Sequence, residues 1–112
     1  MNGNSRLEQL LQFLEQDPCD PFNIYAVALE YRKTEPTTAK KYFDELLQNF
    51  PDYLPTYYHA GMLWQELEQI NEAKEIFLKG MEKARKAGKT KDFNELQNAL
   101  NQLLYTDNEQ ET

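Results

Sequence analysis

Few residues of this chain have the types and spacing that catalysis or metal binding requires. Cys19 is the only cysteine and His59 the only histidine, so neither an internal disulfide nor a zinc site can be built from them. Asp44 and Glu45 are adjacent in an expected helix, where neighbouring side chains point about 100° apart and do not converge as a catalytic pair. The single serine and four glycines supply neither a nucleophile turn nor a phosphate loop. We expect a protein that is not an enzyme and uses no cofactor or metal.

Length and charge narrow the class of partner. A chain of 112 residues has the size of one domain. Its formal net charge of -7 disfavours nucleic acid and anionic membranes as partners. No apolar run approaches the roughly 20 residues needed to cross a bilayer, and polar residues interrupt the N-terminal stretch, unlike a secretion signal. We expect a cytoplasmic protein whose partners are proteins or peptides.

The charge is unevenly distributed along the sequence. Residues 79–91 are strongly basic, with Glu82 as the only acidic residue among them. Cations near the end of a helix complement its dipole, so we interpret the run as a solvated helix end, with contact to phosphate or an acidic peptide as the alternative. The basic residues are Lys79, Lys83, Arg85, Lys86, Lys89 and Lys91.

Apolar spacing and capping residues predict an all-α protein of about six helices. A leucine stripe with helical spacing predicts a first helix over 4–16, which Asp17 and Pro18 end. Asp20 and Pro21 have the types typical of a helix start and open the second helix, which runs to Lys33. The third helix is expected over 37–49.

The second half of the chain predicts three more helices. The fourth covers 55–68, and the fifth covers 71–87 with Asn71 as its N-cap and Gly88 as its C-terminal stop. The sixth opens near Thr90 or Lys91 and ends at Tyr105. The remaining residues, 106–112, are expected to be a flexible acidic tail.

Two stretches repeat each other at a spacing of about 34 residues. Ala39 and Phe43 return as Ala73 and Phe77, and a small residue, Gly80, follows in the second copy. Ahead of each pair lies a second matched set of an aromatic residue, a small residue and another aromatic residue. These residues are Tyr25, Ala28 and Tyr31 in the first copy and Tyr58, Gly61 and Trp64 in the second.

These positions resemble the tetratricopeptide repeat. The resemblance implies a right-handed α-α superhelix of antiparallel helix pairs, with repeats at 21–51 and 54–87. Helix 4–16 would then lead the stack and helix 90–105 would cap it, because each repeat buries its apolar face only against neighbours. Together they form a predicted single domain of residues 1–105.

The resemblance also implies a protein-interaction module whose ligands lie on a concave face. The positions at which some family members clamp a terminal carboxylate hold Tyr25, Leu29, Tyr58 and Met62, so no such clamp is expected. An aromatic and apolar face suits an apolar or amphipathic peptide segment instead. The predicted binding residues are Phe22, Tyr25, Leu29, Arg32, Lys33, Tyr58, Met62, Gln65 and Glu66.

Three alternatives remain open at the level of sequence. The tyrosines of the predicted face can pack against the protein's own helices. The apolar ends of the stack can instead dock on a second copy, which makes the chain a self-assembling unit such as a homodimer. Finally, helix 4–16 can act as a lid over the binding face, although the position of Pro18 favours a structural role for it.

Overall fold

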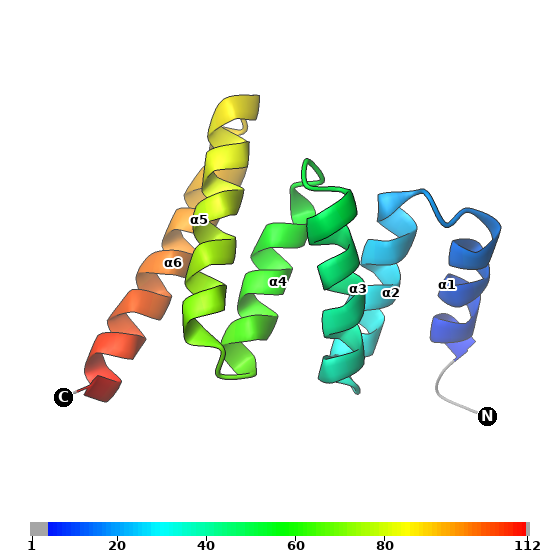
Figure 1. The fold of residues 1–112 in the computed structure, drawn as a ribbon, viewed down its shortest axis with the longest axis horizontal. Coiled ribbons are helices and arrows are strands. Elements are labelled where there is room, and N and C mark those ends of the chain that lie inside the picture. Colours follow the sequence, from blue (N-terminus) through cyan, green and yellow to red (C-terminus); the bar gives the residue numbers. More distant parts are fainter. Residues whose placement is uncertain (1–4, 112) are drawn as a thin grey trace. The chain divides into compact units, whose positions relative to one another are not determined.

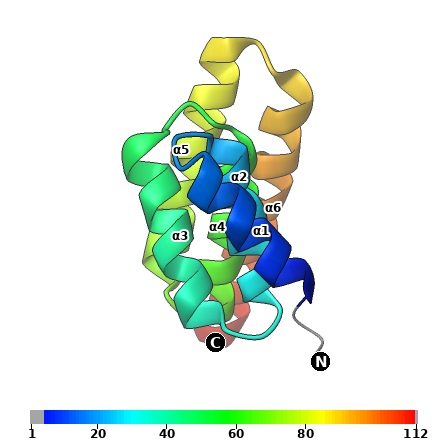
Figure 2. The same cartoon turned by 90° about the vertical axis from the view of Figure 1, so that its right-hand side faces the viewer.

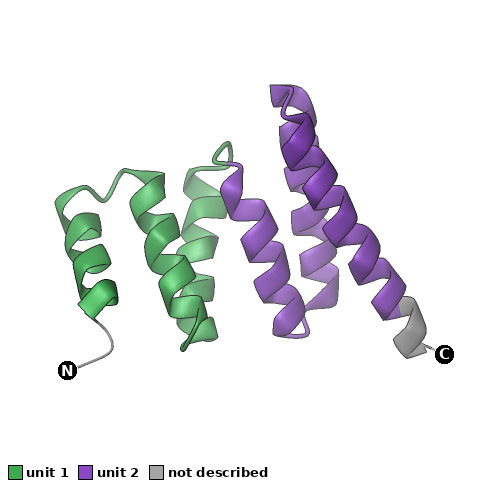
Figure 3. Ribbon diagram, turned by 180° about the vertical axis from the view of Figure 1, so that it is seen from behind, with its two compact units in different colours: residues 1–53 green, residues 54–112 purple. Residues whose placement is uncertain are grey.

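The computed structural model describes residues 5–111 of the chain, and the side chains of residues 5–107. Within this range the backbone forms six α-helices and no strand (Figure 1). The chain divides into two compact units, residues 1–53 and 54–112, coloured separately in Figure 3. The division falls between the two predicted repeats, so each unit contains one of them. The predicted single domain of residues 1–105 stays a prediction.

Unit 1 contains α1 (Ser5–Gln16), α2 (Pro21–Arg32) and α3 (Pro36–Asn49), with successive helices antiparallel. The side chain of Asp20 accepts a hydrogen bond from the Phe22 backbone N–H at 3.0 Å, which confirms the predicted cap of α2. The buried residues of this helix pair are Ile24, Val27 and Ala28 on α2 and Ala39, Phe43 and Leu46 on α3.

Helix α1 packs against α2 (Figure 2). The leucines of α1 face this contact but remain half-exposed, and none of the residues of α1 is fully buried. Polar groups of α2 hold its two ends. The Asn23 amide donates to the carbonyl oxygens of Phe13 at 3.3 Å and Asp17 at 3.1 Å, and Arg6 pairs with Glu30 at 3.2 Å. Helix α1 is therefore anchored within unit 1 through both apolar and polar contacts.

Unit 2 contains α4 (Pro55–Glu66), α5 (Ile70–Ala87) and α6 (Thr90–Glu111). Helix α5 is antiparallel to both neighbours, and α4 and α6 also contact each other. Small residues allow the close approach of α4 and α5, since a Cβ at Gly61 would overlap the ring of Phe77. The core includes Tyr57, Ala60, Leu63, Trp64, Ala73, Phe77, Ala84, Leu96 and Leu103.

The turn between α4 and α5 differs from its prediction. Helix α4 ends at Glu66 and α5 begins at Ile70, with Gln69 at the N-cap position, so the assignment of Asn71 as the cap was wrong. The physical reason is that Glu68 takes a left-handed φ of 63°. This conformation stops α4 and lets the Gln69 N–H donate to the Trp64 carbonyl at 2.9 Å, which closes the turn early. The predicted stop of α5 is confirmed, since Gly88 has a φ of 70°.

Helix α6 is longer than its prediction. It was expected to end at Tyr105, but it continues to Glu111. Residues 106–111 are therefore helical, the flexibility expected of residues 106–112 stays a prediction, and Thr112 lies outside the described residues. An ion pair explains part of the difference. Lys74 of α5 contacts Asp107 with 2.8 Å between Nζ and Oδ2, and both side chains are partly buried. This contact fastens the last turns of α6 to the neighbouring helix.

Candidate functional site

The largest described pocket of unit 2 lies between α4 and α6 and has a volume of about 660 Å³. On α6, the lining residues are spaced as one face of a helix, at i, i+3, i+4 and i+7. The lining residues on α4 also share one face of that helix, except for His59, which lies beside this face. The lining residues are Tyr58, His59, Met62 and Gln65 from α4 and Glu95, Asn98, Ala99 and Gln102 from α6.

The two walls of this pocket differ in chemistry. On the α4 wall, Tyr58 is 37% exposed, and its ring meets that of His59 edge-on, with centroids 5.3 Å apart. Met62 is half-buried beside it. On the α6 wall, Asn98 and Gln102 present exposed amide groups. Glu95 adds an exposed carboxylate to the same wall. The pocket therefore combines an adaptable apolar surface with amide groups and one acidic side chain.

Three of the four binding residues predicted in unit 2 lie in this pocket. These are Tyr58, Met62 and Gln65, whereas Glu66 lies in a second pocket. Sequence reasoning missed the whole contribution of α6, because that helix was treated as a cap with a polar outer face. A signal was present in Ala99, a small residue on the α6 face that lines the pocket.

The second pocket continues along the same two helices. Its volume is about 440 Å³, and Gln65 lines both pockets. Carboxylates dominate its polar lining. Its lining residues are Gln65, Glu66, Glu68, Ile70, Leu103, Thr106 and Asp107.

The other five predicted residues lie on α2 of unit 1, except for Lys33, which follows its last residue. Tyr25 contacts Tyr53 edge-on, with ring centroids 5.6 Å apart, and burial, with a smaller effect of the Tyr53 charge, raises the pKa of Tyr25. Phe22 is 56% exposed, whereas Leu29 and Arg32 are half-buried. Lys33 pairs with Glu30 at 3.2 Å. One continuous groove through all nine residues stays a prediction.

The described residues offer little else for chemistry. Residues 5–107 include no group of three or more histidine, cysteine or acidic side chains placed to hold a metal ion. Cys19 is exposed. No described helix combines the length and apolarity needed to cross a membrane.

The antiparallel helices and their small-residue contacts define an all-α helical-repeat protein. Two solved structures of a tetratricopeptide repeat domain protein from Salinibacter ruber are similar to this chain. The solution structure is 41% identical, with a TM-score of 0.74, over 78% of this chain and 89% of that one. The crystal structure is 40% identical, with a TM-score of 0.72, over 75% of this chain and 96% of that one. The chain therefore belongs to the tetratricopeptide repeat family.

A more distant structure supports the same fold over almost the whole chain. A protein of Bordetella parapertussis aligns with 96% of this chain and 92% of its own, at 20% identity and a TM-score of 0.79. The chain matches no protein-family model, and no curated protein is significantly similar to it. The repeat fold is typically non-enzymatic and makes the chain a protein-interaction module in general terms, with proteins as the class of partner.

Proposed function

We propose that the chain is an adaptor that binds an apolar or amphipathic segment of a partner protein. The pocket between α4 and α6 carries the proposal, because it brings Tyr58, Met62 and Gln65 together on one surface. Its volume of about 660 Å³ lies within the range of ordinary ligand pockets, roughly 300–1,000 Å³. In unit 1, the proposed contacts are Phe22, Tyr25, Leu29, Arg32 and Lys33.

The side chains of the pocket suit a protein ligand. Tyrosine offers a large contact area that loses little conformational entropy on binding, and methionine adapts to the shape of its partner. The positions of a carboxylate clamp hold uncharged residues, such as Leu29 and Met62, so the proposed ligand is not recognised through a free C-terminus. The net charge of -7 favours a protein ligand over nucleic acid or an anionic membrane.

The proposed binding face is tested by charge substitution. The double variant Tyr58→Glu/Met62→Glu places two carboxylates in the pocket and should abolish capture of partner proteins from a lysate of the native cell, scored by mass spectrometry. Leu78→Glu is the matched control, because Leu78 lies on α5, is 53% exposed and does not line the pocket. Unchanged capture by a folded double variant, as judged by circular dichroism, would show that the assigned face is wrong.

Self-association is the second candidate function. It is favoured by apolar side chains that remain exposed on the first and last helices. Phe13 of α1 is 53% exposed, and Leu104 and Tyr105 of α6 are 38% and 66% exposed. A homodimer that covers these side chains should appear by light scattering at micromolar concentration and should dissociate on Tyr105→Glu. A monomer across the accessible concentration range would rule out this function.

A further inference from the structure

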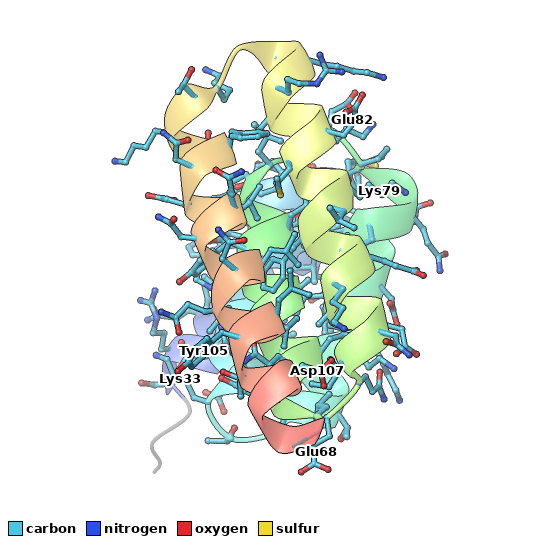
Figure 4. All side chains as sticks on the ribbon, turned by 90° about the vertical axis from the view of Figure 1, so that its left-hand side faces the viewer. Lys33, Glu68, Lys79, Glu82, Tyr105 and Asp107 are labelled. Atoms are coloured by element: carbon cyan, nitrogen blue, oxygen red, sulfur yellow. The ribbon has the colours of Figure 1, made fainter. Side chains whose placement is uncertain are left out.

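The basic run of residues 79–91 lies at one end of unit 2, around the turn between α5 and α6. Its six basic residues and one acidic residue give it a net charge of +5 in a chain of net charge -7, which leaves -12 on the other residues. Figure 4 shows Lys79 and Glu82 toward this end of unit 2, and Glu68 and Asp107 toward the other. The chain therefore presents a positive surface at this turn although it is acidic as a whole.

Helix dipoles account for only part of this basic run. Arg85 and Lys86 lie in the last turn of α5, where a cation is favourable, and they pair with Glu82 at 2.8 Å and 3.6 Å. Lys89 and Lys91 lie beyond α5, at the start of α6, where the dipole disfavours a cation. In the part of the chain that the structure describes, neither of these two lysines forms an ion pair. The solvated helix end expected from the sequence explains the first pair of cations but not the second.

A small pocket opens among these cations. Its volume is about 190 Å³, below the roughly 300 Å³ at which small-molecule pockets begin, so it has the size for one side chain rather than for a whole small molecule. Apolar side chains, the buried Ala84 and the half-buried Phe93, line it together with exposed cationic ones. Its lining residues are Ala84, Arg85, Gly88, Lys89, Thr90 and Phe93.

The backbone of the turn holds this pocket in shape. The Lys89 N–H donates to the Ala84 carbonyl oxygen at 2.9 Å, and the Phe93 N–H donates to the Lys89 carbonyl oxygen at 2.9 Å. A Cβ placed at Gly88 would meet no atom within 4 Å, so the turn is open on that side. Figure 1 shows the turn extending past the neighbouring end of α4. Because the pocket is already formed, binding there requires little ordering of the protein.

Three carboxylates near the run reduce its charge without cancelling it. Glu82 accepts from Nε of Arg85 at 3.4 Å and from Nη2 at 2.8 Å, but a guanidinium has five N–H donors, so donors remain for a second carboxylate. Asp92 and Glu95 follow on α6, and neither lines this pocket. With both included, residues 79–95 hold six basic and three acidic side chains, a net charge of +3.

The charge of the whole chain favours a short acidic segment as the occupant. A nucleic acid is a long polyanion that would extend beyond the basic run onto acidic surface. A second copy would bring its own net charge of -7, and proteins of like charge repel each other. A short segment meets only the basic run, because screening limits exposed charges to about 8 Å at physiological ionic strength.

We propose that the α5–α6 turn is a second docking site, which binds an acidic segment of a partner protein that carries one large apolar side chain. The apolar side chain enters the pocket against Ala84 and Phe93. Carboxylates of the segment pair with Arg85, Lys89 and Lys91, and they supply the negative charge that the start of α6 favours. The site is separate from the pocket between α4 and α6, so it extends the proposed function to another surface.

Binding of a fluorescent, end-capped peptide to the full chain tests this site. The probe is a short acidic peptide with one central phenylalanine. One control peptide replaces the phenylalanine by alanine, and the other replaces the acidic residues by their amides. Wild type should bind the probe more tightly than either control. Equal binding of either control peptide would overturn the inference, because the pocket or the cations would then contribute nothing.

Substitution of the two unpaired lysines tests the electrostatic part. Lys89→Gln/Lys91→Gln should weaken binding of the probe about threefold to tenfold at low salt, as expected for the loss of two exposed ion pairs, and the difference should shrink at high salt. Lys40→Gln/Lys41→Gln is the matched control, because it removes the same charge from α3 and should bind as wild type does. Equal affinity of wild type and a folded Lys89→Gln/Lys91→Gln variant would overturn the inference.

Nuclear magnetic resonance locates the bound probe. The largest shifts of backbone amide resonances should fall on residues 84–93. Largest shifts on α4 would place the peptide in the first pocket and overturn the inference, while the proposed function would stand. Conversely, if capture of partners survives Tyr58→Glu/Met62→Glu but the probe binds at the α5–α6 turn, the proposed function fails and the second site stands.

Two further outcomes would assign the turn to a different occupant. Tighter binding of single-stranded DNA than of the probe, lost in Lys89→Gln/Lys91→Gln, would make nucleic acid the ligand. Self-association in light scattering that the same variant abolishes, without binding of the probe, would make a second copy the occupant. Either result would overturn the inference.

Discussion

Gly80 of α5 lies directly against Tyr57 of α4. A Cβ atom built at Gly80 would be 2.5 Å from the Cβ of Tyr57 and 3.0 Å from a methyl carbon of Leu96. Tyr57 is fully buried, so it has no room to move away. The glycine therefore sets how closely α5 approaches both of its neighbours in unit 2.

This contact predicts that Gly80→Ala destabilises the protein. In an open helix the substitution should stabilise by roughly 1 kcal/mol through helix propensity, but overpacking of a core typically costs about 1–3 kcal/mol. We expect a net loss in the free energy of unfolding, measured by urea denaturation. Lys79→Ala, at the exposed neighbouring position, is the control and should change stability little. A stabilised Gly80→Ala variant would contradict the close packing of α4 and α5.

The end of α5 depends on backbone conformation rather than packing. Gly88 has a φ of 70°, and no atom lies within 4 Å of a Cβ placed there. Gly88→Ala should therefore destabilise by about 1 kcal/mol through left-handed strain alone. Gly88→Asn should cost less, since asparagine tolerates this conformation better. Thermal unfolding of the two variants tests this order of stability. Equal stability of Gly88→Ala and wild type would show that the left-handed conformation at the end of α5 causes no strain for a residue with a side chain.

The ion pair between Lys74 and Asp107 predicts a local effect at the end of α6. Asp107→Asn should lower the free energy of unfolding by less than about 1 kcal/mol, because both groups remain partly exposed. Amide hydrogen exchange should rise mainly in the last turns of α6. If amide exchange beyond Tyr105 is already fast in wild type, the end of α6 is flexible, as the sequence predicted, and the ion pair does not hold it.

Three tyrosines of unit 1 predict a loss of stability at alkaline pH. Burial, more than neighbouring charge, raises the pKa of Tyr25, Tyr42 and Tyr53 in the folded state. Above the unfolded value of about 10, the unfolded chain loses these protons first, so the folded state binds more protons and the free energy of unfolding falls as pH rises.

Denaturation at several alkaline pH values measures this slope. Tyr42→Phe should make the slope shallower than in wild type, because it removes one of the three groups. Tyr105→Phe is the control at an exposed position and should leave the slope unchanged. An unchanged slope in Tyr42→Phe would contradict the shifted pKa of that residue.

Local sequence signals located most helix ends. Asp20 and Pro21 started α2, and Gly88 stopped α5, because a cap depends on the few residues around it. The early end of α4 at the turn containing Glu68 was not predicted, because a left-handed conformation is unusual for glutamate. The end of α6 was not predicted, because Lys74, which pairs with Asp107 near that end, is distant in the sequence.

The repeat pattern alone determined the all-α repeat fold and identified small residues such as Gly61 and Gly80 that face aromatic rings. This pattern of residue types repeats along the chain, so it can be recognised from the sequence alone. The tertiary structure decided that α6 supplies Asn98 and Gln102 to the wall opposite Met62, and that carboxylates of α4, of the turn that follows it and of α6 line the second pocket. These relationships arise only when two helices separated by α5 come into contact, so no local pattern could have placed them.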